Sequence, residues 1–125
     1  MRCLLPLTVA IVLFACSCRS NRVLVRFRNA SYEDFRKLNI KIFDSTYHFE
    51  NLESDHHTKY IRVKESYPYC SMEVITYRDT VKLAPAVYLD KQLYKKGKLI
   101  ISISFKPYKY KRKRLLNIST KYQPL

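Results

Sequence analysis

The chain has 125 residues, a length that allows one domain with short extensions. Its 24 Lys and Arg residues outnumber its 10 Asp and Glu residues, and the formal net charge of +14 indicates an anionic partner or surface. With 47% hydrophobic and 14% aromatic residues the chain is not disordered throughout, and its single glycine excludes a glycine-rich loop that cradles phosphate.

The N-terminus has the pattern of a secretory signal. Arg2 supplies a positive charge, and residues 4–14, LLPLTVAIVLF, form an almost unbroken apolar run. This run is shorter than the roughly 20 residues that cross a bilayer, and it fits the apolar region of about 7–15 residues in a signal peptide. We therefore expect an exported protein.

The apolar run ends in Leu13, Phe14, Ala15 and Cys16, which resemble the lipobox of bacterial lipoproteins. In that family a small residue precedes a cysteine whose thiol takes a diacylglycerol, cleavage occurs just before this cysteine, and the new amine is acylated. The resemblance implies a signal peptide at residues 1–15 and lipid attachment at Cys16, whose thiol is a suitable nucleophile. Phe14 is bulkier than the usual residue at its position, and Cys18 is a second candidate.

Two alternatives remain for this segment. One is an ordinary cleaved signal with incidental cysteines. The other is a membrane-spanning signal anchor, against which the short apolar run and the positive charges of Arg19 and Arg22 argue.

Cys18 and Cys70 could also form a disulfide in an oxidising compartment. We favour instead a buried Cys70 and an unpaired Cys18, because Cys18 lies so close to the anchor.

After a polar, basic tether at residues 16–22, apolar and polar residues alternate, which is typical of half-buried strands. Two strands are predicted first, at residues 23–29 and 37–43, with turn-forming residues after each. Each turns three apolar side chains to one face: Val23, Val25 and Phe27 in the first, and Leu38, Ile40 and Ile42 in the second. Residues 47–52 then form a short aromatic segment.

The remaining predicted strands follow the same pattern. Residues 59–64 alternate, with Tyr60 and either Ile61 or Val63 inward, and Pro85 makes residues 81–89 an edge strand or a loop. Gly97 predicts a hairpin turn. The most convincing strands are residues 69–77, with Cys70, Met72, Val74 and Thr76 on one side, and residues 99–105, with Leu99, Ile101, Ile103 and Phe105 on one side. Because no helical period appears, residues 23–105 are predicted to form an all-β domain, a small antiparallel β-sandwich.

The segments VRFRNAS, DFRKLNIKI, KYIRVKESYPY and YKKGKLIISISF together resemble a group of small lipoproteins of the Bacteroidota, which pair a lipobox with a short all-β domain. The likeness covers about residues 1–105. It implies a sandwich, immunoglobulin-like or transthyretin-like, in the cell envelope, and it implies no mechanism. The chain departs from this group in its basic C-terminus and its near absence of glycine.

Residues 106–125 form a basic extension, in which residues 115–120 could add one more edge strand. Its cationic side chains are Lys106, Lys109, Lys111, Arg112, Lys113 and Arg114. Such a run stays solvated unless an anionic group lies beside it, and near a charged bilayer each cation contributes about 1 kcal/mol. We expect the run to bind phosphates of lipid or lipopolysaccharide on the membrane that the anchor already reaches. A merely solvated strand end is the other interpretation.

No reaction is legible in the sequence. His56 and His57 lie in a polar segment, but adjacent histidines point apart on a strand, and a metal site needs three or four converging ligands. Glu33 and Asp34 fit the turn before the second strand better than an acid–base pair. Asn29-Ala30-Ser31 and Asn117-Ile118-Ser119 match the glycosylation sequon, which is short enough to occur by chance. We expect no enzyme activity, cofactor or metal.

The sequence therefore predicts a lipid-anchored protein of the bacterial cell envelope, at the outer membrane, that serves as a structural or binding module. The expected partner is the membrane itself, with anionic lipid or lipopolysaccharide at the basic run. Tyr108 and Tyr110 would also allow stacking on nucleic-acid bases, but an exported protein rarely meets nucleic acid. The alternative is a secreted basic protein that binds polyanions and carries no lipid.

Overall fold

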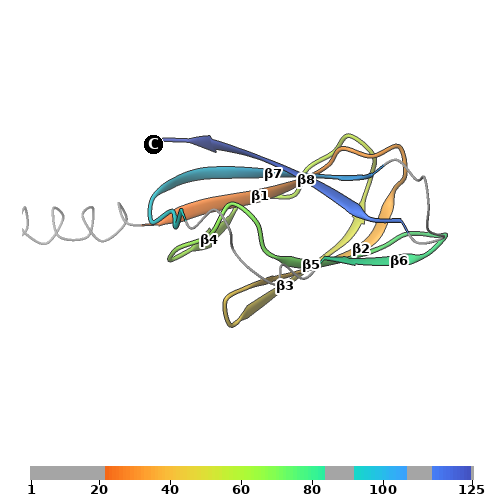
Figure 1. The fold of residues 1–125 in the computed structure, drawn as a ribbon, viewed down its shortest axis with the longest axis horizontal. Coiled ribbons are helices and arrows are strands. Elements are labelled where there is room, and N and C mark those ends of the chain that lie inside the picture. The colour runs from red at the N-terminus through yellow and green to blue at the C-terminus, as the bar shows by residue number, and fades with distance from the viewer. Residues whose placement is uncertain (1–21, 84–91, 107–113, 125) are drawn as a thin grey trace, which may run out of the picture.

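The computed structural model describes residues 22–83, 92–106 and 114–124, and the signal segment lies outside them. The described residues form two four-stranded sheets that pack face to face, seen as two layers in Figure 1. The strands are β1 (Val23–Asn29), β2 (Phe35–Ile42), β3 (Ser45–Leu52), β4 (Ile61–Val63), β5 (Ser71–Ile75), β6 (Thr80–Leu83), β7 (Gly97–Phe105) and β8 (Leu116–Gln123). The predicted all-β sandwich is confirmed.

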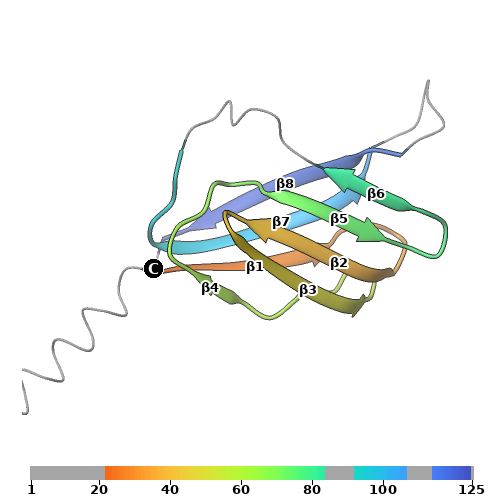
Figure 2. The same ribbon diagram turned by 90° about the horizontal axis from the view of Figure 1, so that it is seen from below.

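The strand order is β4-β1-β7-β8 in one sheet and β3-β2-β5-β6 in the other, as Figure 2 shows. β1 and β7 run parallel, and the other named strand pairs are antiparallel. Lettered in chain order, the sheets read D-A-G-H and C-B-E-F. This order differs from that of an immunoglobulin constant domain, which groups its strands as ABED and CFG.

The core forms between the two sheets because the strands alternate in polarity. β1 turns Val23, Val25 and Phe27 inward, and each of them is fully buried. The same alternation, in β2, in β7 and in β5 with the residue on either side of it, buries Leu38, Ile40, Ile42, Cys70, Met72, Val74, Thr76, Leu99, Ile101 and Ile103, as the sequence predicts. Complete burial of one large apolar side chain contributes about 1.5–3 kcal/mol to folding, so this layer accounts for the stability of the domain.

The predicted hairpin turn at Gly97 is wrong. Gly97 is the first residue of β7, and β6 and β7 belong to different sheets. The glycine is needed for another reason: its φ is +106°, and a Cβ atom there would lie 2.6 Å from Cε2 of Tyr122. Gly97 is therefore explained by its positive φ and by the close Tyr122 ring, and not by a turn.

The two edge strands β3 and β8 are both longer than predicted. The aromatic segment near Tyr47 belongs to β3, a full edge strand paired with β2. The additional edge strand expected after the basic run is confirmed as β8, which pairs with β7 from Lys98 to Phe105. Within the described ranges there is no helix long and apolar enough to cross a bilayer.

Candidate anion-binding surface

Most of the site residues that the sequence predicts lie outside the described residues. These are Cys16, Lys109, Lys111, Arg112 and Lys113. Lys106 is described and exposed, and its backbone N–H donates to the carbonyl oxygen of Leu115 at 2.8 Å, where β7 and β8 part. Because Val23 aligns with Gly97 in the parallel pair, Lys106 lies at the end of the sandwich opposite to the start of β1.

Val23, next to the tether, and Lys106, the first residue of the basic run, lie at opposite ends of the sandwich. The tether enters the sandwich at the start of β1, whereas the basic run begins where β7 ends. The parallel pairing of β1 with β7 is the reason, since it places the first residue of β7 beside Val23 and the last residue far from it.

Arg114 has a different role from the one predicted. Its side chain is only 13% exposed, and its guanidinium pairs with the carboxylates of Glu33 and Asp79. Nε donates to Oδ2 of Asp79 at 3.0 Å, Nη2 donates to Oγ1 of Thr76 at 3.3 Å, and the guanidinium carbon lies 4.0 Å from the centroid of the Phe105 ring. The charge of Arg114 is therefore compensated inside the fold and does not face an external anion.

The ion pair between Arg114 and Asp79 shifts the pKa of both side chains. Hydrogen bonding from the Arg114 guanidinium lowers the pKa of Asp79, and the same bond raises the pKa of Arg114. Three connections of the fold meet here: the β1–β2 connection carries Glu33, the β5–β6 turn carries Thr76 and Asp79, and Arg114 precedes β8. We call these four residues the Arg114 cluster.

A second group of cations, which the sequence analysis did not single out, covers the outer face of the sheet β4-β1-β7-β8. Its outward side chains form rows across the strands. One row joins Arg62 on β4, Leu24 on β1 and Lys98 on β7. The next joins Arg26 on β1, Ile100 on β7 and Lys121 on β8, and Arg28 follows along β1. We call Arg62, Leu24, Lys98, Arg26, Ile100, Lys121 and Arg28 together the cationic face.

The charges of the cationic face are largely uncompensated within the described residues. Arg28 pairs with Asp55, while the ion pairs found in the described ranges do not include the other cations of the face. Arg26 and Lys98 instead lie over the ring of Tyr60, at 4.7 and 5.4 Å from its centroid. Nε of Arg26 is buried and has no hydrogen-bond partner in the described part of the chain.

The outer face of the other sheet carries both signs of charge. Lys37 lies opposite Glu50 on the neighbouring strand, and Nζ of Lys82 lies 3.5 Å from Oε2 of Glu73. Glu73 also accepts a hydrogen bond from Nδ2 of Asn39 at 3.0 Å. Acidic side chains therefore offset part of the positive charge on this face, whereas four cations of the cationic face have no such partner among the described residues.

Sequence reasoning could find part of the cationic face. The alternation in β1 already separates Arg26 and Arg28 from the buried positions. The rest depends on strand order, because Arg62, Lys98 and Lys121 join β1 only through its pairing with β4 and β7 and through the pairing of β7 with β8. No local pattern reveals those neighbours.

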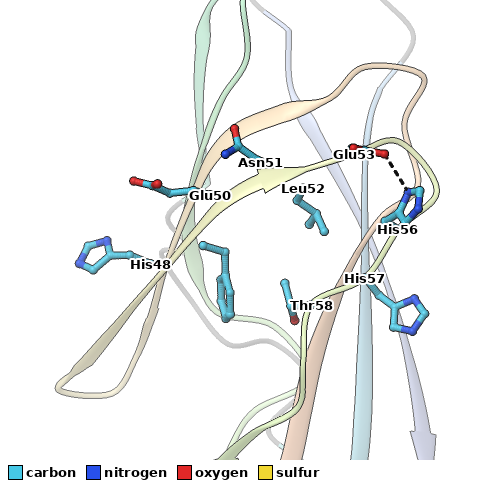
Figure 3. A pocket seen from close by; sticks show the side chains of 9 residues that line it. His48, Glu50, Asn51, Leu52, Glu53, His56, His57 and Thr58 are labelled. Atoms are coloured by element: carbon cyan, nitrogen blue, oxygen red, sulfur yellow. Dashed lines mark ion pairs between the residues drawn. The ribbon is translucent and has the colours of Figure 1, made fainter.

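The three histidines line a hollow of about 530 Å³ beside β3, drawn in Figure 3. His48 and His57 point to opposite sides of this hollow, and Nδ1 of His56 lies 3.9 Å from Oε2 of Glu53. Among the described residues there is no group of three His, Cys, Asp or Glu side chains placed to hold a metal ion. Among the described residues, the side chains that line the hollow therefore do not converge on a common point.

Asn29, the first residue of one sequon, is fully buried and has a structural role. Its Nδ2 donates to the carbonyl oxygens of Glu33 at 2.7 Å and Leu52 at 3.0 Å, and its Oδ1 accepts from the backbone N–H of Ser31 at 3.0 Å. The nitrogen that a glycan would need is thus occupied inside the protein. Asn117, in the other sequon, is exposed.

Cys70 is a free, buried thiol, only 3% exposed, and burial raises its pKa to about 12. Cys18, its alternative disulfide partner, lies outside the described residues. The buried position agrees with the favoured interpretation of Cys70 as a small apolar core residue.

Comparison with protein-family models, with curated proteins and with solved structures finds no match for this chain. Its fold type therefore rests on the strand order, and its function on the chemistry of the surfaces described above.

Proposed function

We propose that the protein is a lipid-anchored binding module of the bacterial cell envelope that associates with phosphate-bearing anionic surfaces and carries out no catalysis. The observation that carries this proposal is the cationic face, where Arg26, Arg62, Lys98 and Lys121 lack carboxylate partners among the described residues. Uncompensated cations on one side of a small domain attract an anionic surface and orient the domain toward it.

The size of this attraction is sufficient for a weak but oriented association. A Lys or Arg close to an anionic leaflet contributes on the order of 1 kcal/mol, and the effect decays over a Debye length of about 8 Å at physiological salt. A lipid at Cys16 would hold Val23 no more than about 25 Å of extended chain from the leaflet, so the cationic face could come within a Debye length of it without leaving the membrane. Anchor and cationic face would then support each other.

The titratable groups with shifted pKa values also favour a binding role over catalysis. Asp79 and Asp55 have lowered pKa values because each is hydrogen-bonded to an arginine, Arg114 and Arg28 respectively. Groups that are perturbed by ion pairs of this kind have a structural explanation and need no catalytic one.

The anchor is tested by detergent phase partitioning of the full chain, wild type against Cys16→Ala, after expression in a bacterium that processes lipoproteins. We expect wild type in the detergent phase and Cys16→Ala in the aqueous phase or unprocessed. Cys18→Ala is the matched control and should partition as wild type does. Equal partitioning of two correctly processed proteins would refute lipid attachment at Cys16.

A secreted polyanion-binding protein without lipid is the second candidate, since the cationic face would serve it equally well. The mass of the mature N-terminus separates the two. A diacyl or triacyl mass on Cys16 supports the anchored module, and an unmodified N-terminus supports the secreted protein.

A further inference from the structure

We propose that the sandwich lies flat on an anionic bilayer, with the cationic face against the lipid phosphates and the strands parallel to the membrane plane. This inference rests on the proposed function and adds the orientation and the contacting surface. It predicts that Leu24 and Ile100, at the centre of the face, meet the headgroup region, while the outer face of β3-β2-β5-β6 points away.

The first argument is that the tether and the basic run join the sandwich at opposite ends. The tether enters at Val23, and the basic run begins after Phe105, at the other end of β7. β7 has 9 residues, which span about 30 Å at roughly 3.3 Å per residue. A domain standing on either end would bring only one of these segments to the membrane, whereas a domain lying on its side brings both.

The second argument selects the side. The rows of the cationic face place the partly exposed Leu24 between Arg62 and Lys98, and Ile100 between Arg26 and Lys121. Apolar side chains flanked by cations match the boundary between acyl chains and anionic headgroups.

Tyr60 supports the same side of the sandwich. It lies beside the face under Arg26 and Lys98, and tyrosine is a residue enriched at headgroup level.

The opposite face is a poor candidate for the same contact. Glu50 and Glu73 project from its strands beside Lys37 and Lys82. Their carboxylates would be repelled by lipid phosphates, and the neighbouring lysines are already paired or opposed by them. A bilayer therefore discriminates between the two faces by charge alone.

The orientation is tested with one fluorophore on either face of the full, anchored chain reconstituted into vesicles. Ser119→Cys labels the edge strand β8 on the side of the cationic face, and Thr46→Cys labels the edge strand β3 on the opposite face. A Cys18→Ser background limits labelling to the new thiol, since Cys70 is buried and its pKa is raised to about 12. Acrylamide reports access from water, and nitroxide-headgroup lipids report contact with the membrane.

With vesicles of phosphatidylglycerol and phosphatidylcholine, we expect the label at position 119 to be shielded from acrylamide and quenched by the nitroxide lipid. The label at position 46 should stay accessible to acrylamide. In pure phosphatidylcholine, or at 1 M salt, where the Debye length is about 3 Å, the difference between the positions should disappear. Equal shielding of both labels in anionic vesicles, or shielding of position 46 alone, would overturn the proposed orientation.

Charge variants identify the residues responsible. Lys98→Gln with Lys121→Gln should lower the ratio of shielded to accessible label at position 119 roughly thirtyfold, which corresponds to about fivefold per lysine. Lys37→Gln with Lys41→Gln removes the same charge from the opposite face and should leave the ratio unchanged. An equal effect of both pairs would show that only net charge matters, against a specific face.

Failure of the orientation and failure of the proposed function are distinguishable. If both labels become equally shielded in anionic vesicles and not in pure phosphatidylcholine, the inference is wrong and the function stands. If the access of neither label differs between anionic and pure phosphatidylcholine vesicles, the proposed association with anionic surfaces fails. Shielding of position 119 by soluble polyphosphate without shielding by vesicles would replace the bilayer with a polyanion and overturn the inference.

Discussion

The Arg114 cluster and the cationic face use positive charge in opposite ways. Arg114 is 13% exposed and is held by Glu33 and Asp79, so its charge is part of the fold. Lys121 is exposed on β8, and it is absent from the ion pairs found in the described part of the chain. The comparison teaches that the charge excess alone does not identify a binding surface, because Arg114, the last cation of the basic run, is neutralised inside the fold.

The difference has an energetic cause. A nearly buried guanidinium must be compensated, because removing a charge from water costs several kcal/mol. An exposed lysine keeps its hydration and needs no partner, but like charges on one face repel and slightly weaken the fold. We therefore expect substitution of Arg114 to lower stability strongly, and substitution of cations on the cationic face to change stability little while weakening the proposed association with the membrane.

The largest effect on stability is expected at Arg114. Arg114→Ala leaves the carboxylates of Glu33 and Asp79 without their partner and should lower the free energy of unfolding by about 2–3 kcal/mol, somewhat below the value for a fully buried pair. Urea denaturation followed by circular dichroism measures this loss. Lys106→Ala, at an exposed position nearby, should change it by less than about 0.5 kcal/mol. Equal effects of the two substitutions would contradict the assignment.

An intermediate effect is expected from pH at Asp79, whose pKa is lowered by the Arg114 hydrogen bond. Its folded pKa lies below its unfolded value of about 3.9. The contribution to stability is thus complete above that value and is lost as the pH falls through the folded pKa. It should be smaller than the effect of Arg114→Ala, because the Asp79 side chain is 37% exposed.

The measurement for Asp79 compares wild type with Asp79→Asn by urea denaturation between pH 6 and pH 2. The stability difference between the two proteins should be constant at higher pH and shrink as the acid is protonated. A difference that does not change with pH would argue against an ionised Asp79 as the partner of Arg114.

The smallest effect on stability is expected at the cationic face. Lys98→Gln with Lys121→Gln should leave the free energy of unfolding unchanged or raise it slightly, since repulsion among uncompensated cations is relieved. Added salt should narrow any difference from wild type, because it screens exposed charges. Thermal unfolding at 20 mM and 500 mM salt measures this, and a marked loss of stability in the variant would show that these lysines have partners in the fold.

The sequence predicts the local features of the fold well and the long-range ones poorly. Period-two alternation places Val25, Ile40 and Ile101 in the core without any tertiary information. The Arg114 cluster is invisible to such reasoning, because Arg114 is 81 positions from Glu33 and 35 from Asp79.

Gly97 shows how a local signal misleads. In the sequence this glycine suggests a turn. In the structure a glycine is required there because the backbone has a positive φ and lies against Tyr122. The cationic face has the same limit as the Arg114 cluster, since its rows exist only once β1 pairs with β7 and β4.

The parallel pairing of β1 with β7 has a consequence for how the protein matures. The first strand of the chain has as its central neighbour a strand that begins only at Gly97, so its sheet cannot be completed until most of the chain is present. Pairings so distant in sequence form slowly, typically over milliseconds to seconds. Until then Val23, Val25 and Phe27 remain uncovered, which makes this strand the segment most exposed to aggregation and most in need of a chaperone.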